Sequence, residues 1–191
     1  MTNKESNSNP LGTVRRSIWF VLRAVLIVSL LIGLAFAVFT EGMYISNMSL
    51  IVTEGMKLRA DTILNNGPIA DLRLYFTEDL LDTDPMLLGN LYSDYTVESY
   101  DYRYSIKSVS VLPWANTGSV TYIERIPSIN ATPVSDEVTG HVRAWTPVLY
   151  KIQFVKVEGS WLIDKLIVLE ENPEEDAKPT PDYSQLETNN P

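Results

Sequence analysis

The chain of 191 residues contains no cysteine. Disulfide bonds and thiolate metal sites are therefore excluded. Without such cross-links a folded domain depends on its hydrophobic core. The content of hydrophobic residues, 45%, is ordinary for a globular protein, and the length allows one domain outside a membrane segment rather than two.

Histidine is nearly absent as well, since His141 is the single one. One histidine cannot form a multi-histidine metal site, and no Ser/His/Asp or Cys/His set is supported around it. The acidic run at 78–84 has the carboxylates that calcium prefers, but it lacks the glycine and terminal glutamate of a calcium-binding loop. We interpret this run as the solvated start of a helix. The sequence thus predicts no catalytic residue, no metal site and no cofactor.

Basic residues are outnumbered, with 15 lysines and arginines against 24 aspartates and glutamates, for a net charge of -9. A protein that binds nucleic acid through its phosphates needs a basic face, so nucleic acid is not expected as a partner. The charge is uneven along the chain. Residues 1–23 carry four basic residues and one acid, whereas residues 170–191 carry one lysine and seven acids. That acidic, proline-containing end is typical of a disordered tail.

One long hydrophobic run covers residues 18–39, and Arg23 is the single charge within it. At 1.5 Å per residue, a helix of this length spans about 33 Å, which is enough for the hydrocarbon core of a bilayer. Arg23 lies one turn inside the run, where its long side chain reaches the headgroups, and Trp19 lies at the same interfacial level. The run predicts a single transmembrane helix.

The residues that flank this run predict its orientation. Arg15 and Arg16 precede it, whereas Glu41 and Glu54 follow it before any basic residue appears. The positive-inside rule then places the N-terminus in the cytoplasm and the rest of the chain outside the cell membrane. The competing interpretation is a cleaved signal peptide with an A-x-A site at 35–37, which leaves the domain on the same side. An outer domain without cysteine also fits a bacterial envelope.

The sequence divides into four expected segments: a cytoplasmic segment at 1–17, a transmembrane helix at 18–39, an extracytoplasmic domain at 40–169 and the acidic tail at 170–191. Within the domain, apolar residues recur at helical spacing over 47–65, and Asn66-Gly67-Pro68 ends that helix. Short helices are expected to follow from Pro68 and from 77–79.

From residue 95 the apolar period changes to two, which is typical of strands. The first predicted strand, 95–111, changes phase near its middle, as a β-bulge produces. Further strands are expected at 119–126, 141–157 and 161–169, with a polar loop over 127–140. Helices followed by antiparallel strands predict an α+β fold, with the helices packed on one face of a curved antiparallel sheet of four or more strands.

The last predicted hairpin carries a family resemblance. It consists of YKIQF at 150–154, a Glu-Gly turn at 158–159 and WLI at 161–163. Together with the element order over 47–169, this hairpin resembles the nuclear transport factor 2-like fold, a cone of helices in a curved sheet. With its membrane segment, the chain is also similar in layout to the inner-membrane assembly factor of type IV secretion and conjugation systems. The resemblance implies a scaffold that contacts other envelope proteins and pairs with a second copy of itself.

A cluster of tyrosines is the most distinctive feature of the predicted strands. Tyr100, Tyr102 and Tyr104 share one face, whereas Asp101 points to the other, so this aspartate cannot join them in one pocket. The alternatives for the three tyrosines are ordinary sheet packing and the lining of a ligand pocket. Trp114 lies in a turn after a strand and is the best candidate for an exposed contact residue.

Three functional hypotheses follow. The first is a membrane-anchored, non-enzymatic interaction or assembly module of the cell envelope, in a secretion or conjugation apparatus. The second is an extracytoplasmic domain whose cone holds a small molecule or a lipid. The third is an isomerase-like or dehydratase-like enzyme of the same fold, which requires a tyrosine and a carboxylate to converge in one pocket.

Overall fold

The computed structural model describes residues 10–135, 138 and 140–175, and for residues 10–17 it describes the backbone alone. Residues 1–9 of the predicted cytoplasmic segment and residues 176–191 of the predicted tail lie outside the described residues.

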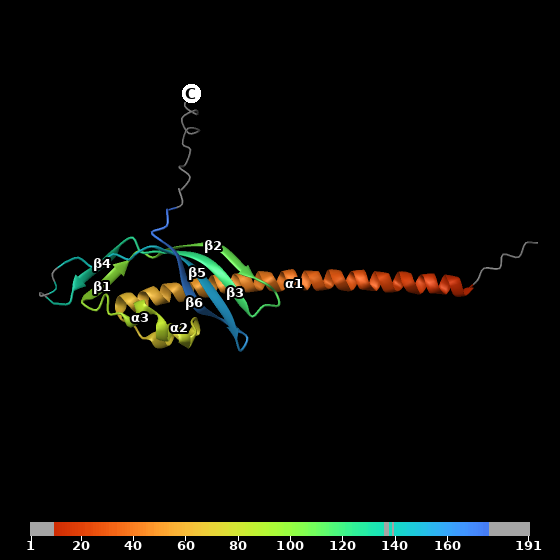
Figure 1. The fold of residues 1–191 in the computed structure, drawn as a ribbon, viewed down its shortest axis with the longest axis horizontal. Coiled ribbons are helices and arrows are strands. Elements are labelled where there is room, and N and C mark those ends of the chain that lie inside the picture. The colour runs from red at the N-terminus through yellow and green to blue at the C-terminus, as the bar shows by residue number, and fades with distance from the viewer. Residues whose placement is uncertain (1–9, 136–137, 139, 176–191) are drawn as a thin grey trace, which may run out of the picture.

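Helix α1 runs without a break from Pro10 to Asn65, over 56 residues (Figure 1). The sequence predicted two helices, at 18–39 and 47–65, and the structure joins them through the intervening residues. No proline occurs between Pro10 and Pro68, so nothing in this stretch blocks the helical hydrogen bonds. Gly42 alone does not break the helix, because a glycine costs a helix about 1 kcal/mol relative to alanine.

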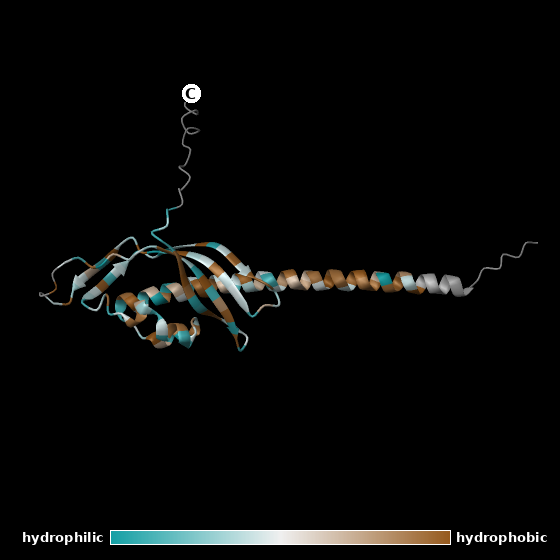
Figure 2. Ribbon diagram, viewed as in Figure 1, coloured by the Kyte–Doolittle hydropathy of each residue, from teal (hydrophilic) through white to brown (hydrophobic). Residues whose placement is uncertain are grey.

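The two halves of α1 have different surroundings. The N-terminal half, with a mean hydropathy of 2.6 over its most apolar window, is not buried by any other element (Figure 2). It is the one helix in the described part of the chain that is long and apolar enough to cross a membrane. This single N-terminal helix fits a single-pass membrane anchor. The C-terminal half, from Met48 onward, packs inside the folded domain.

Three short helices follow α1. They are the 3-10 helix η1 (Ile69–Leu74), α2 (Glu78–Thr83) and α3 (Pro85–Leu88). Asp84 separates the last two, and its side chain accepts a hydrogen bond from the backbone N–H of Met86, which caps the start of α3. Pro85 follows as the first residue of α3, a position where its missing N–H is harmless.

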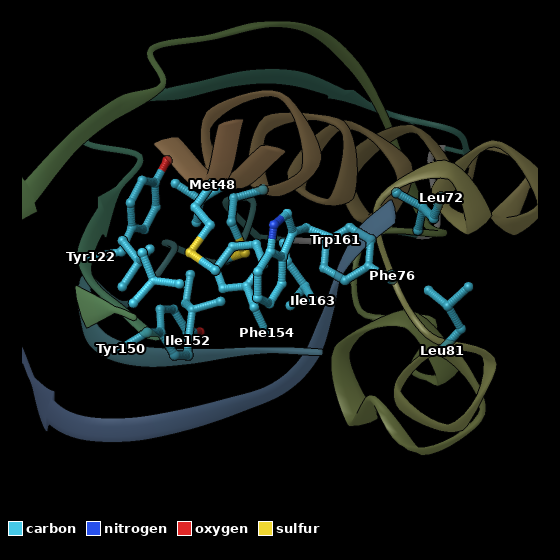
Figure 3. Close-up of a cluster of buried hydrophobic side chains, with 14 of the residues drawn as sticks. Met48, Leu72, Phe76, Leu81, Tyr122, Tyr150, Ile152, Phe154, Trp161 and Ile163 are labelled. Carbon is cyan, nitrogen blue, oxygen red and sulfur yellow. The ribbon is translucent and has the colours of Figure 1, made fainter. Parts of the chain in front are cut away.

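Six strands form two antiparallel sheets. The four-stranded sheet has the order β2-β3-β5-β6, and the two-stranded sheet pairs β1 with β4. The strands are β1 (Tyr95–Tyr100), β2 (Arg103–Val111), β3 (Thr117–Arg125), β4 (Ile129–Pro133), β5 (Val148–Val157) and β6 (Ser160–Glu171). The predicted α+β fold is confirmed, because the helices of the domain lie on one face of the larger, curved sheet (Figures 1 and 3).

Three details of the strand prediction are corrected. The predicted strand 95–111 is two strands in different sheets, although the expected bulge is present in β2, between Ile106 and Ser108. The predicted loop 127–140 contains β4, which completes the small sheet. The predicted strand 141–157 begins at Val148, directly after Pro147, because proline cannot donate to the ladder.

The core lies between α1 and the concave face of the four-stranded sheet (Figure 3). Met48, Val52 and Met56 recur at helical spacing and bury one side of α1. They meet inward-facing residues of the sheet, all 8% exposed or less: Tyr122, Tyr150, Ile152, Phe154, Trp161 and Ile163. The expected alternation in β5 is confirmed, since Val148, Tyr150, Ile152 and Phe154 are all buried.

A bulge in β6 changes which of its residues face inward. Phe154 of β5 pairs with Ile163, but Gln153 pairs with Lys165, so Asp164 is the extra residue. Beyond this bulge Leu166 and Val168 lie opposite inward-facing residues of β5. Ile167 pairs with Lys151, which is exposed, and Leu169 is the extra residue of a second bulge between Val168 and Glu170.

We expect Gly55→Ala to destabilise the protein although alanine is the better helix former. A Cβ at position 55 would lie 2.9 Å from Tyr75 Cβ and 3.2 Å from its Cγ, so Tyr75 must shift. Overpacking of this kind costs about 1–3 kcal/mol and exceeds the helix-propensity gain of about 1 kcal/mol. The control is Gly42→Ala in the same helix, where nothing lies within 4 Å and stability should rise. Thermal unfolding in detergent measures the melting temperature of both variants. An equal rise in the melting temperature of the two variants would contradict the prediction.

Candidate functional site

A cleft of about 990 Å³ opens beside the core, between α2 and α3 on one side and strands β5 and β6 on the other. The loop at 143–146 closes one end. Apolar and aromatic side chains form much of its wall: Leu80, Met86, Trp145, Tyr150, Leu166 and Val168. Val168 is 51% exposed there because the helix does not cover this end of the concave face. The concave face of the four-stranded sheet is thus filled at its centre and open at this end.

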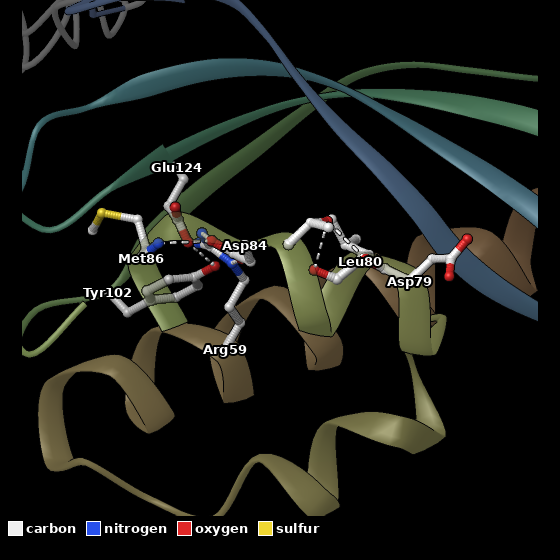
Figure 4. A network of polar contacts seen from close by, with 8 residues as sticks. Arg59, Asp79, Leu80, Asp84, Met86, Tyr102 and Glu124 are labelled. Carbon is white, nitrogen blue, oxygen red and sulfur yellow. Dashed lines mark hydrogen bonds and ion pairs between the residues drawn. The ribbon is translucent and has the colours of Figure 1, made fainter. Parts of the chain in front are cut away.

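Arg59 of α1 forms a buried ion pair with Asp84 at the base of the cleft (Figure 4). Arg59 follows Met56 by three residues, which places it on the buried side of the helix. Its Nε donates to Asp84 Oδ2 at 2.6 Å and its Nη2 donates to Asp84 Oδ1 at 3.0 Å. This two-point geometry suits a guanidinium and a carboxylate, and both side chains are only 3% exposed.

The ion pair does not engage the Nη1 of Arg59. Burial opposes the charge of Arg59, but the hydrogen bond and charge of Asp84 outweigh this effect and raise the pKa of Arg59. Arg59 is therefore a cation at any physiological pH. Its Nη1 is closed to solvent and makes no hydrogen bond of ordinary geometry among the described residues, although the guanidinium lies close enough to the Tyr150 hydroxyl to lower the pKa of that group. The Arg59 side chain lines the cleft and places a fixed positive charge at its base.

A second carboxylate lies behind the ion pair. Glu124 of β3 is fully buried, and its Oε1 accepts a hydrogen bond from the hydroxyl of Tyr102 at 3.1 Å (Figure 4). The hydroxyls of Tyr102 and Tyr122 lie 3.0 Å apart and share a hydrogen bond. The other carboxylate oxygen of Glu124 makes no hydrogen bond of ordinary geometry within the described chain, although the indole of Trp145 lies close enough to favour the ionised form. Glu124 does not line the cleft itself.

Burial dominates the proton affinities of this cluster. It raises the pKa of Glu124 to about 7, although Arg59 and Tyr102 favour the ionised form. It also raises the pKa of Tyr150 to about 12, with the charge of Glu124 adding to the effect. The pKa values of Tyr102 and Tyr122 are raised for the same first reason. The tyrosines therefore remain neutral hydrogen-bonding groups, and Glu124 is the one that titrates near neutral pH.

The two buried carboxylates differ in their access to the cleft. Glu124, which titrates near neutral pH, lies outside the cleft lining. Asp84 lines the cleft but is engaged by Arg59 and by the N–H of Met86. The cleft also offers an apolar wall, acidic and basic side chains, and Trp145, which stacks on Tyr92 with ring centroids 6.3 Å apart.

The three tyrosines singled out by the sequence do not line this cleft. Tyr102 and Tyr104 do share a face, with rings 6.4 Å apart, and Tyr104 stacks on Tyr122 at 5.7 Å. Tyr100 belongs to β1, and its hydroxyl donates to Asp61 of α1 at 3.1 Å. The three tyrosines thus make packing contacts within the sheet and with α1, and Tyr100 also lines a smaller pocket of about 300 Å³. Asp101 is bound to Arg103 and does not join the cluster around Tyr102.

Three of the other predicted site residues, Trp19, Arg23 and Trp114, lie at the surface. Trp19 and Arg23 are exposed on the apolar half of α1, and Arg15 and Arg16 are helical in backbone, with side chains outside the described set. Trp114 is 77% exposed in the turn between β2 and β3, as expected of a contact residue.

Sequence reasoning missed the residues that form the site. The acidic run was interpreted as solvated, which fits Asp79 and Asp82 but not Asp84, which is 3% exposed because it pairs with Arg59. Two signals were present. Arg59 falls on the apolar stripe of its helix, and Glu124 has the same strand parity as Val120 and Tyr122. A charged residue on a buried face needs a partner, and this rule points to both.

Two expectations concerned metals. His141 is exposed in the loop before β5. Among residues 10–135, 138 and 140–175, no group of three or more histidine or acidic side chains is arranged to hold a metal ion.

No family model matches the chain, and no curated protein or solved structure is significantly similar to it. The likeness to the nuclear transport factor 2-like fold and to the secretion assembly factor therefore stays a prediction.

Proposed function

We propose that this protein is a membrane-anchored binding module whose cleft takes a small amphipathic molecule and performs no chemistry on it. The observation that carries the proposal is an open cleft of about 990 Å³ with a largely apolar wall and the guanidinium of Arg59 at its base. A concave, mostly apolar pocket with a small number of fixed polar groups is typical of small-molecule sites.

The shape and lining of the cleft support the ligand class. A volume of about 990 Å³ lies at the upper end of the range that holds small molecules. The aromatic and aliphatic wall favours an apolar body, and the guanidinium favours a carbonyl or carboxylate oxygen at one end. Two further basic residues, Arg143 and Lys165, and three acidic ones, Asp79, Asp164 and Glu171, also line the cleft. Their net charge is small, so they do not select a strongly charged ligand.

We further propose that the domain faces the outside of the cell. The supporting residues are Arg15 and Arg16 before the apolar half of α1 and Glu41 and Glu54 after it. Because α1 is continuous, this orientation holds the cleft away from the bilayer, with Arg59 about 30 Å along the helix from Phe39.

The scaffold role in a secretion or conjugation apparatus, with pairing between copies, also stays a prediction. No contact among the described residues favours it over other functions of an anchored domain. The turn between β2 and β3, which contains the exposed Trp114, lies at the end of the domain nearest the apolar half of α1 (Figure 1).

A matched pair of substitutions tests ligand binding. Val168→Trp places an indole in the cleft, whereas Leu169→Trp places it at a neighbouring position of β6 that does not line the cleft. The two positions are 51% and 52% exposed, so both variants should fold. In ligand-observed NMR with full-length protein in nanodiscs, we expect 4-phenylbutyrate, an apolar ring with a carboxylate, to bind the wild type and Leu169→Trp. Binding should be lost in Val168→Trp.

Empty nanodiscs give the background from partitioning into lipid. Equal binding by the two variants would show that the probe does not use the cleft. No binding by wild type to a panel of such small aromatic acids and their amides would count against the proposed ligand class.

A further inference from the structure

The turn between β2 and β3, residues 112–116, presents apolar side chains that nothing covers. We call this segment the β2–β3 tip. Trp114 is 77% exposed, the highest fraction among the exposed large hydrophobic residues, and Leu112 is 54% exposed. The turn is ordered by a hydrogen bond from the N–H of Ala115 to the carbonyl of Leu112 at 3.0 Å. Burying a tryptophan side chain contributes more free energy than burying almost any other side chain. We therefore expect a partner surface to cover Trp114.

The β2–β3 tip is tied to α1 close to its apolar half. The carbonyl of Asn116 accepts a hydrogen bond from the N–H of Lys156 at 2.8 Å. The Nζ of Lys156 donates to the hydroxyl of Tyr44 on α1 at 2.9 Å and lies 4.6 Å from the centre of its ring. Tyr44 in turn packs edge-on against Trp161, with centroids 5.4 Å apart.

A second contact supports this placement. Gly118, just after the tip, lies so close to Met48 that any Cβ at position 118 would overlap Met48 Cε. The tip is therefore fixed against α1 through both Tyr44 and Met48, so its position along the helix is defined.

The length of helix between these contacts and the apolar run is short. Tyr44 follows Phe39 by five residues, which is about 7.5 Å along the axis. The headgroup layer outside the hydrocarbon core is about 5–7 Å thick. The tip extends from the Tyr44 contact toward the apolar half, and it lies beside α1 at that end of the domain (Figure 1). This places Trp114 at headgroup depth if the run ending at Phe39 spans the bilayer.

We propose that the β2–β3 tip is a second membrane contact, in which Trp114 and Leu112 insert into the lipid headgroup layer and fix the tilt of the domain. The inference rests on the proposed membrane anchoring by residues 18–39. Tryptophan suits this layer because its ring is apolar and its N–H is a donor. The tip carries no charged residue, so the contact does not require anionic lipid.

The absence of cysteine makes a direct test simple. A nitroxide is attached to one introduced cysteine in the full-length protein, reconstituted in phosphatidylcholine vesicles. Its collisions with oxygen, which prefers lipid, and with a water-soluble nickel chelate report its depth. The positions are Leu112→Cys at the tip, Leu30→Cys within the apolar run, and Val134→Cys, 64% exposed just after β4 at the far end of the domain (Figure 1).

We expect the label at 112 to collide several-fold more with oxygen relative to nickel than the label at 134, and the label at 30 to lie deepest. Adding Trp114→Glu should move the label at 112 into water without changing the label at 134, because a carboxylate is costly in the interface. The exposure of Trp114 makes loss of folding unexpected, and near-UV circular dichroism checks it.

A label at 112 as aqueous as that at 134, with the label at 30 in lipid, would overturn the tip contact while leaving the anchor intact. The apolar tip would then be left for a protein partner. A label at 30 in water would overturn the anchor, and the tip proposal with it.

Discussion

Arg59→Met is expected to lower the free energy of unfolding by about 3–5 kcal/mol, because it leaves Asp84 as a buried carboxylate without its counter-charge. The pair is 3% exposed on both sides, so water cannot replace the lost partner. Methionine keeps most of the volume of the arginine side chain, so the loss reports on charge more than on packing. Denaturant unfolding of the full-length protein, followed by the fluorescence of buried Trp145 and Trp161, measures it.

The chain offers a matched control in an exposed ion pair. Arg73 and Glu78 lie 3.9 Å apart, with side chains 66% and 77% exposed. Arg73→Met should cost less than about 1 kcal/mol, since water screens such pairs. The double variant Arg59→Met/Asp84→Asn should lose less than the sum of the single variants, because no buried charge remains unpaired. If Arg59→Met lowered the free energy of unfolding no more than Arg73→Met, the buried ion pair would not stabilise the base of the cleft.

The stability of the wild-type protein is expected to fall as the pH rises from about 4.5 to about 7, through the ionisation of Glu124. Burial raises the pKa of this carboxyl from 4.5 to about 7 in the folded state. Between these values the unfolded chain has released the proton that the folded chain still holds, so raising the pH favours unfolding. At about 1.4 kcal/mol per pKa unit, the loss is on the order of 3 kcal/mol.

Glu124→Gln isolates this contribution. A glutamine keeps an oxygen that can accept from Tyr102 but has no proton to lose, so its stability should decline less over the same pH range. The exposed Glu170→Gln should follow the wild type. Unfolding curves at pH 5 and pH 7 for the three proteins measure this loss of stability. An equal loss in all three proteins would mean that Glu124 is already ionised in the folded state at pH 5.

Both predictions concern residues that sit under the proposed ligand site, so they also bear on binding. Arg59 is held by Asp84 in a position where its side chain lines the cleft. The ion pair therefore orients the guanidinium before any ligand arrives, which lowers the entropy lost on binding. The β2–β3 tip lies at the other end of the domain, so its membrane contact and ligand binding are separable in experiments.

The sequence by itself determined the elements whose physics is local. The run at 18–39 predicts a membrane-spanning helix because its apolar length matches a bilayer, and no tertiary contact is needed for that conclusion. The alternation in 148–154 predicts a half-buried strand, and the phase change in 95–111 predicts a bulge that is present. The order of these elements was enough for the α+β class.

Tertiary structure determined which buried charged residues form an ion pair and where the cleft lies. Arg59 and Asp84 are 25 positions apart, and nothing in the spacing of residues tells which acid among many meets a buried arginine. The bulge at Asp164 turns Leu166 and Val168 inward, and the short helices stop before covering them, which creates the cleft. Which charged residues pair, and where a cleft remains, depends on how helices and strands meet in three dimensions. Sequence periodicity records only which face of each element is buried.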